Sequence, residues 1–205
     1  MDLSAYQIGP FHDEMFVSAG EPRTHARSIA EKLSRMSVAE LAECRQTAEA
    51  ALRRLGITFN VYGDEGAQER IMPFDVIPRV IANEEWSYME KGLIQRITAL
   101  NLFLEDIYHD QKIIHDNVIP ADVVLSSKGF LKECMGFSPP KKIWCHITGT
   151  DIICNRHGRM LVLEDNLRSP SGVSYVLENR ELMKGIMPDM FQSGEIGPSP
   201  IIHTI

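Results

Sequence analysis

The chain lacks three features that mark specialised classes of protein: an excess of basic charge, a long hydrophobic run and an internal repeat. Its 205 residues carry 21 Lys and Arg against 28 Asp and Glu, which gives a formal net charge of -7. Nucleic-acid binding normally needs a basic face, so we expect no nucleic-acid partner. No apolar stretch approaches the roughly 20 residues of a membrane span, and the N-terminus lacks a basic-then-apolar signal pattern. We therefore expect a cytoplasmic protein without a membrane partner.

Closely paired cysteines are also lacking. The chain has four cysteines and no CxxC pair. This pattern is typical of reduced, mostly buried thiols rather than of a disulfide framework. Cys145, His146, Asp151 and Cys154 lie close together in sequence and raise zinc as an alternative, but structural zinc sites usually show closer cysteine pairs.

Helical signals dominate the first half of the chain. Residues 1–22 are loop-like, and the pattern from 25 to 55 predicts two helices. Ser37 and Glu40 form the capping box that starts the second helix, and Gly56 is a natural stop.

Two further elements follow in sequence. "ITFNVY" (57–62) has the β-branched and aromatic content of a strand, and 63–81 is a charged loop. Asn83 can cap the next helix, for which we expect a long buried element. Its apolar stripe consists of Trp86, Met89, Leu93, Ile97, Leu100, Leu104 and Ile107.

Strands dominate the region that follows a short helix after Pro120. "KIWCHI" (142–147), "DIIC" (151–154) and "RMLVLE" (159–164) read as strands, and "NRHG" between the last two reads as a hairpin turn. A final helix is expected over 173–183. The fold class is therefore α/β in the broad sense (α+β), with a mixed or antiparallel sheet and flanking helices.

The end of the last strand carries an unusual polar stretch, "LEDNLRSPSG". Residues two apart in a strand share a face, so Glu164 and Asn166 point the same way. If the turn places Cys154 opposite Arg159, Asp151 joins them on a diagonal of about 7–8 Å. Two carboxylates and an amide oxygen at that spacing suit Mg²⁺. The pattern thus predicts a metal site at Asp151, Glu164 and Asn166.

Alternatives stay open for this hairpin. A three-residue loop with Gly158 in a bulge would change the register and could turn Asp151 to the other face. A plain solvated hairpin end is the bland interpretation. Arg168 is suited to an oxyanion, and Ser169 and Ser171 can offer hydroxyls at the start of the next helix, although Ser171 could simply cap that helix.

At these residues the sequence resembles a known family. "GTDIICNRHGRMLVLEDNLRSPSGVSYVLENR", "GITFNVYGDEGAQERIMPFDVIPRVI" and "GLIQRITALNLFLEDIY" are similar to the circularly permuted ATP-grasp proteins, relatives of glutathionylspermidine synthetase. The resemblance covers roughly residues 11 to 191. It implies a partial circularly permuted ATP-grasp fold.

The resemblance also implies a chemistry. In ATP-grasp ligases an Asp on one strand and a Glu-x-Asn on its partner hold the magnesium ions that bridge ATP phosphates, which corresponds here to Asp151, Glu164 and Asn166. Serines after that motif contact the peptide substrate in the glutathionylspermidine synthetase relatives, which corresponds to Ser169 and Ser171. The implied reaction joins a small-molecule or peptide carboxylate to an amine with ATP as substrate and Mg²⁺ as cofactor. Arg168 would act as a catalytic residue that steadies an oxyanion.

Other arginines have two interpretations. Arg70 and Arg79 stand in the loop after the first strand, where they would line the nucleotide site or form structural salt bridges. Arg96 lies next to the apolar stripe of the long helix, and a buried ion-pair partner is the favoured interpretation over a ligand clamp.

The C-terminal residues depart from the family. We expect an N-terminal loop region over 1–22, a partial ATP-grasp domain over 23–191 and a disordered tail over 192–205 that does not resemble the family. Family members continue with the nucleotide-clamping half, so two hypotheses stand. The chain belongs to an ATP-dependent carboxylate–amine ligase and carries its metal-binding half, or it is a truncated, non-catalytic remnant or a binding module whose ATP clamp a second chain completes.

Overall fold

The computed structural model describes residues 1–59, 70–192 and 197. Its chain divides into two compact units, and each is described separately. Among the described residues, the first unit contains Met1–Asn83, Ile153–Leu161 and the part that begins at Ser171, and the second contains Glu84–Ile152 and Val162–Pro170. Within the described residues, no helix is long and apolar enough to cross a membrane.

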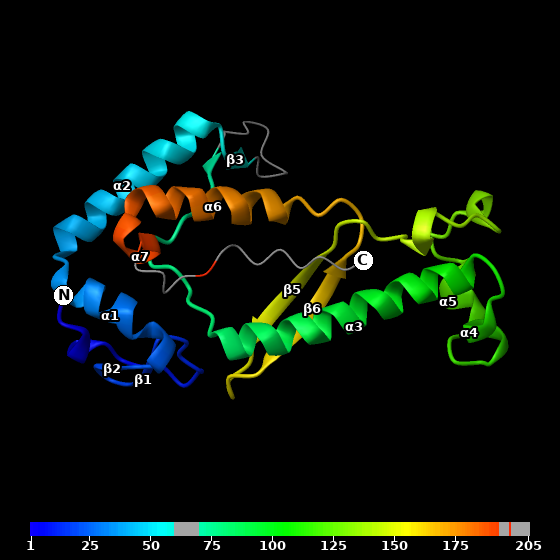
Figure 1. Cartoon of the computed structure of the whole chain (residues 1–205), viewed down its shortest axis with the longest axis horizontal. Helices are drawn as coiled ribbons and strands as arrows, with labels where there is room; N and C mark the ends of the chain where they lie inside the picture. Colours follow the sequence, from blue (N-terminus) through cyan, green and yellow to red (C-terminus); the bar gives the residue numbers. More distant parts are fainter. Residues whose placement is uncertain (60–69, 193–196, 198–205) are drawn as a thin grey trace. The chain divides into compact units, whose positions relative to one another are not determined.

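Helices form the core of the first unit. They are α1 (Arg27–Arg35), α2 (Val38–Leu55), α6 (Gly172–Ile186) and α7 (Pro188–Gln192), with 3-10 turns at Leu3–Ala5 and Thr24–Ala26. Helix α6 runs beside α2 (Figure 1). The buried side chains of this unit form two neighbouring clusters, with Ile29, Leu33 and Met187 in one and Ala48 and Leu52 in the other.

The predicted start and end of α2 are confirmed. Ser37 Oγ accepts a hydrogen bond from the backbone N–H of Glu40 at 3.1 Å, and the Glu40 carboxylate accepts one from the backbone N–H of Ser37 at 2.7 Å. Two backbone donors at the start of the helix are thereby satisfied. Gly56 ends the helix with a φ of 67°, a conformation that glycine adopts without a steric cost.

Short strands complete the first unit. β1 (Phe16–Ser18) pairs with β2 (Glu21–Pro22), a hairpin inside the stretch that was expected to be loop. β3 (Thr58–Phe59) pairs with β4 (Arg70–Ile71), both antiparallel. The predicted strand at 57–62 is confirmed only at Thr58 and Phe59, because its remainder from residue 60 lies outside the described residues, as does 63–69 of the predicted loop.

The second unit is built on one long helix, α3 (Asn83–Ile107), which confirms the predicted element. The short helices α4 (Lys112–His115) and α5 (Ala121–Leu125) lie at its C-terminal end (Figure 1). The expectation of a buried helix is wrong in part, because only Met89, Ile97 and Ile107 of α3 are buried. Tyr88 and Leu102 are exposed.

Aromatic rings close the end of this unit. Tyr108 stacks between Phe130 and Trp144, with ring centroids 5.1 and 4.9 Å away, and lies in the buried cluster with Ile107 and Val124. Stacked rings at these distances stabilise the folded state by more than the buried apolar area alone would give.

The predicted strand at 142–147 is wrong. A 3-10 turn occupies Pro140–Lys142, and Lys141 and Lys142 have φ values of 57° and 59°, which an extended strand does not tolerate. The backbone N–H groups of Trp144 and Cys145 donate to Oδ1 of Asn101 on α3, at 2.7 and 3.0 Å. A helix side chain therefore takes the donors that a neighbouring strand would have used.

The remaining strands form the predicted hairpin, β5 (Gly149–Cys154) and β6 (Met160–Asn166). The described residues thus combine helices with small two-stranded antiparallel sheets, an α+β arrangement. Of the two expected arrangements, mixed or antiparallel, the described residues show the antiparallel one. The domain limits at 22 and 191 stay a prediction, and the predicted disordered tail falls almost entirely outside the described residues.

Candidate metal-binding site

The turn of the β5–β6 hairpin adopts the alternative geometry. The backbone N–H of Asn155 donates to Arg159 O at 3.0 Å, and that of Gly158 donates to Asn155 O at 2.9 Å. Gly158 has a φ of 76°, so the loop has three residues with glycine in the left-handed position. Asn155, not Cys154, therefore lies opposite Arg159, and the register assumed for the turn is wrong.

The expected convergence of the three oxygen-bearing side chains is nevertheless present. The amide nitrogen of Asn166 donates to Asp151 Oδ1 at 3.5 Å and to Glu164 Oε1 at 3.3 Å. All three side chains are exposed and belong to the second unit. Since side chains alternate along a strand, the turn and this convergence together imply one extra residue in β6 between them, as in a β-bulge.

The chemistry of this set fits a hard divalent cation. Two carboxylates supply charge and four acceptor oxygens, and Mg²⁺ takes one or two carboxylates plus phosphate and water oxygens. The amide donor of Asn166 places partial positive charge between the two acids, where a cation would also be favourable. A half-turn of the amide presents its oxygen there instead. Among the described residues, no group of three or more His, Cys, Asp or Glu is arranged to hold a metal ion, and this includes Cys145, His146, Asp151 and Cys154.

Asp165 lies between two of these residues and points the other way. Its Oδ2 accepts from Nε of Arg96 on α3 at 2.6 Å, and its Oδ1 accepts from Thr150 Oγ1 at 3.0 Å. The side chain of Asp165 is 9% exposed, against 47% for Arg96. The expected ion pair of Arg96 is confirmed, although Arg96 itself is not buried as expected. Asp165 was not predicted as a site residue. Its position between Glu164 and Asn166, with strand alternation, was the signal that could have identified it.

Close packing fixes the strand ends beside the site. A Cβ on Gly149 would lie 2.8 Å from Cβ of Pro170 and 3.8 Å from Cβ of Asn166. Only glycine allows Pro170 to approach the first residue of β5 this closely. The segment after Asn166 is therefore packed against the strand that carries Asp151.

The residues after β6 are accessible. Arg168 is exposed and forms no hydrogen bond or ion pair with any residue that the structure describes. Ser169 is exposed and has a φ of 49°. Ser171 is the N-cap residue of α6, but its side chain makes no capping hydrogen bond, so simple capping does not explain it.

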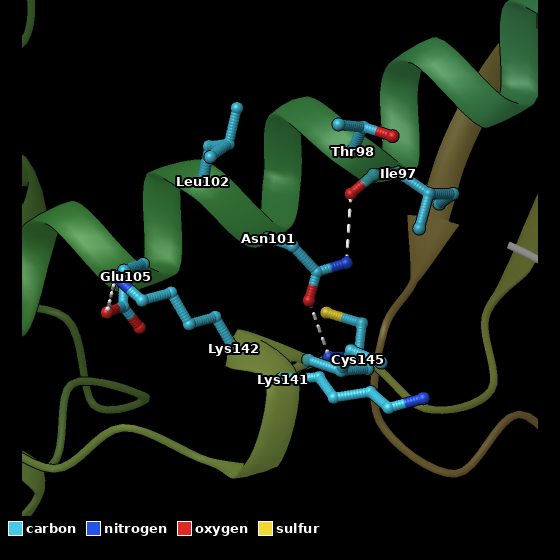
Figure 2. A pocket seen from close by; sticks show the side chains of 9 residues that line it. Ile97, Thr98, Asn101, Leu102, Glu105, Lys141, Lys142 and Cys145 are labelled. Atoms are coloured by element: carbon cyan, nitrogen blue, oxygen red, sulfur yellow. Dashed lines mark hydrogen bonds and ion pairs between the residues drawn. The ribbon is translucent and has the colours of Figure 1, made fainter. Parts of the chain in front are cut away.

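A hollow elsewhere in the same unit differs from the exposed hairpin site. It has a volume of about 340 Å³ and is lined by α3 and the segment around Lys142 (Figure 2). Asn101 and Glu105 point into it from α3, where Asn101 holds the backbone of Cys145 and Glu105 contacts Lys142 (Figure 2). Cys145 is the only buried cysteine of the four, and burial raises the pKa of its thiol. The expectation of mostly buried thiols is thus wrong for the other three, which are half-buried.

Comparison with known proteins decides the family. The model of the circularly permuted ATP-grasp type 2 family matches residues 78–202, more than half of the chain, including α3 and the hairpin. This chain belongs to that family. The match confirms the ATP-grasp resemblance at the level of the family, and the particular likeness to glutathionylspermidine synthetase has no support from it.

Relatives of this ATP-grasp chain are considerably longer. An uncharacterised protein of Synechocystis sp. is 52% identical over 97% of this chain and 41% of its own length. An uncharacterised protein of Mycobacterium leprae is 41% identical over 90% of this chain and 32% of its own. A Frankia alni protein with the name "Putative glutamate--cysteine ligase 2-3" is 36% identical over 97% and 22% respectively. The chain thus spans less than half the length of these relatives, and none of the comparisons supports a second chain.

The arginines that the ATP-grasp resemblance placed near the nucleotide lie in the first unit. Nε of Arg79 is 2.6 Å from a carboxylate oxygen of Glu14, as in the structural salt-bridge interpretation. Arg70 pairs through its backbone in β4, and its side chain lies outside the described residues. Both arginines thus belong to the first unit, whereas Asp151, Glu164 and Asn166 belong to the second.

Proposed function

We propose that this segment supplies the metal-binding part of an ATP- and Mg²⁺-dependent carboxylate–amine ligase. The convergence of Asp151, Glu164 and Asn166 carries the proposal, since hard oxygen ligands on two adjacent strands are the donor set that such a reaction needs. Membership in the ATP-grasp family and the name of the Frankia relative support the reaction class.

The three residues would hold Mg²⁺ on the exposed side of the hairpin. When bound, Mg²⁺ neutralises charge on the ATP phosphates and holds the transferred phosphoryl group in line. Arg168 stands two residues after Asn166, and its guanidinium has no partner among the described residues. It can bind a phosphate or carboxylate oxyanion through two parallel hydrogen bonds. Its place next to the ligands makes it the residue that we propose for steadying the developing charge.

The serines and the other arginines have binding roles in this proposal. Ser169 and Ser171 donate hydroxyl hydrogen bonds to the carboxylate substrate, since neither hydroxyl is used within the described structure. Arg70 and Arg79 contact the nucleotide, which requires Arg79 to exchange its Glu14 partner for phosphate. The carboxylate oxygen attacks the γ-phosphorus and ADP leaves. The amine then attacks the acyl carbon, inorganic phosphate leaves, and the amine loses a proton.

Calorimetry with the 205-residue chain tests the metal site. Titration of wild type with ATP in excess Mg²⁺ should show saturable binding that Glu164→Ala removes. Glu133→Ala is the matched control, because Glu133 is an exposed glutamate of the same unit without a partner in the described structure. Equal binding by wild type and Glu164→Ala would contradict the proposal. Absence of Mg²⁺-dependent binding in wild type would favour the non-catalytic alternative.

A further inference from the structure

The hairpin has a second polar cluster on the side opposite to the proposed ligands. It consists of Asp165 with its two partners Arg96 and Thr150, and we call it the back-face cluster. Its contacts are short, 2.6 Å to Arg96 and 3.0 Å to Thr150, and the Asp165 side chain is 9% exposed. The proposed ligands on the other side are exposed, and their side-chain hydrogen bonds to described residues are long, 3.3 and 3.5 Å.

The sequence positions of the cluster tie it to the ligands. Asp165 stands between Glu164 and Asn166, and Thr150 stands directly before Asp151. Because neighbouring side chains in a strand point to opposite faces, a contact that fixes residue 165 also fixes the direction of both its neighbours. The Thr150–Asp165 hydrogen bond therefore sets how far the two ligand-bearing strand positions lie from each other.

Arg96 adds a second anchor from outside the hairpin. It comes from α3, 69 residues before Asp165 in sequence, and its bond to Asp165 is charge-assisted. A half-buried aspartate without a cation would be costly and would turn toward water. A turn of the strand backbone that exposes Asp165 would also redirect the side chains of Glu164 and Asn166. Arg96 thus keeps Asp165 on the back face and the ligands on the front.

We propose that Arg96, Asp165 and Thr150 are positioning residues for the divalent-metal site formed by Asp151, Glu164 and Asn166. The proposal rests on the metal site proposed above and assigns the cluster no contact with metal or substrate. Partners that orient metal ligands typically change metal affinity by 10- to 100-fold when they are removed.

Arg96→Ala separates positioning from simple electrostatics. The substitution deletes a positive charge near a cation site, so long-range electrostatics alone predicts tighter metal binding. Positioning predicts weaker binding, with a Kd raised roughly 10-fold or more. Lys91→Ala is the matched control, because Lys91 is an exposed cation on the same helix without a partner in the described structure. Its Kd should stay at the wild-type value or fall slightly.

The measurement is a Mn²⁺ titration of the full 205-residue chain, followed by the electron paramagnetic resonance signal of free Mn²⁺. Mn²⁺ prefers the same oxygen ligands as Mg²⁺. The titration is made well below the thermal midpoint of each variant, which a separate melting curve gives. A purely structural role would lower the midpoint and leave the Kd of the folded protein unchanged, and that result would overturn the proposal.

Thr150 provides a second test that does not depend on a charge change. Thr150→Val keeps the shape and removes the donor to Asp165, whereas Thr150→Ser keeps the hydroxyl. We expect a raised Kd in the first and a nearly wild-type Kd in the second. Equal Kd values in both would contradict the proposal, even if Arg96→Ala failed to fold. Wild-type Mn²⁺ binding that Glu164→Ala does not weaken would instead refute the metal site itself.

Discussion

Glu105 and Glu164 lie in the same unit and carry the same side chain, but their carboxylates have different partners. Glu105 accepts from the Trp144 indole at 3.0 Å and from Ser138 at 2.9 Å, and its Oε1 is 3.0 Å from the Lys142 ammonium. The Glu105 side chain is 15% exposed. Glu164 is exposed, and within the described part of the chain it accepts one long hydrogen bond, from Asn166 at 3.3 Å.

The difference between the two glutamates separates a structural carboxylate from an available one. The donors around Glu105, the Trp144 indole first and then Lys142 and Ser138, lower its pKa to about 2. Its lone pairs are already used by its own chain, so it has little to offer a cation. Among the described residues, Glu164 has one long hydrogen bond, from the same Asn166 amide that also donates to Asp151. Two neighbouring carboxylates that share a single weak donor are favoured in water or with a cation.

Alanine substitution of Glu105 and of Glu164 should give the largest difference in thermal stability. Glu105→Ala leaves the Trp144 indole, Ser138 and Lys142 without their acceptor, and we expect the thermal midpoint to fall by about 5 °C or more. Glu164→Ala removes an exposed side chain and should move the midpoint by no more than about 2 °C.

Metal binding should respond in the opposite order. In the Mn²⁺ titration, folded Glu105→Ala should bind as wild type does, and Glu164→Ala should lose binding. The comparison breaks if Glu105→Ala abolishes binding in the folded protein, or if the two variants lose equal stability.

Gly149, the first residue of β5, provides the next test, with a smaller expected effect on stability. Gly149→Ala would bring a methyl group to 2.8 Å from Pro170, beneath Asn166. We expect a loss of about 1 kcal/mol, the low end of overpacking, because the strand end lies near the surface. Chemical unfolding and the Mn²⁺ titration measure the two consequences, and metal affinity should fall together with stability.

Gly92→Ala is the control for that substitution. Gly92 lies inside α3 with nothing within 4 Å of the added Cβ. Alanine there should stabilise the helix by roughly 0.5–1 kcal/mol without changing the metal affinity. An unchanged Mn²⁺ affinity in Gly149→Ala would show that the strand end does not set the ligand positions.

Local signals predicted the elements that local forces stabilise. The capping box at Ser37 and the stop at Gly56 were readable because every partner lies within a few residues. The convergence of Asp151, Glu164 and Asn166 could be predicted because strand alternation and one hairpin bring their side chains together. Its assumed turn register was wrong, since the loop type at Gly158 depends on backbone angles that several turn sequences share.

Long-range partners account for what the sequence could not show. The strand at 142–147 was expected from its β-branched and aromatic residues, but Asn101 takes its backbone donors from more than 40 residues away. Asp165 likewise has its cation 69 residues earlier on α3. Arg96 could be assigned an ion pair in general, but no pattern in the sequence identifies which acid it meets.

Acid unfolding gives the smallest effect and a direct comparison with a free glutamate. The pKa of Glu105 is lowered from 4.5 to about 2, so its contribution to stability is complete above about pH 4.5 and is lost as the pH falls toward 2. Glu105→Gln removes that titration, and its thermal midpoint should fall less steeply with acid over this window than that of wild type.

Melting curves at constant ionic strength measure the slopes, and Glu133→Gln should keep the wild-type slope. Asp13, Glu40 and Asp110, whose pKa values are also lowered, supply part of the slope that remains. If wild type and Glu105→Gln had the same slope, the carboxylate of Glu105 would not be held by its donors in the folded protein, and its contrast with Glu164 would disappear.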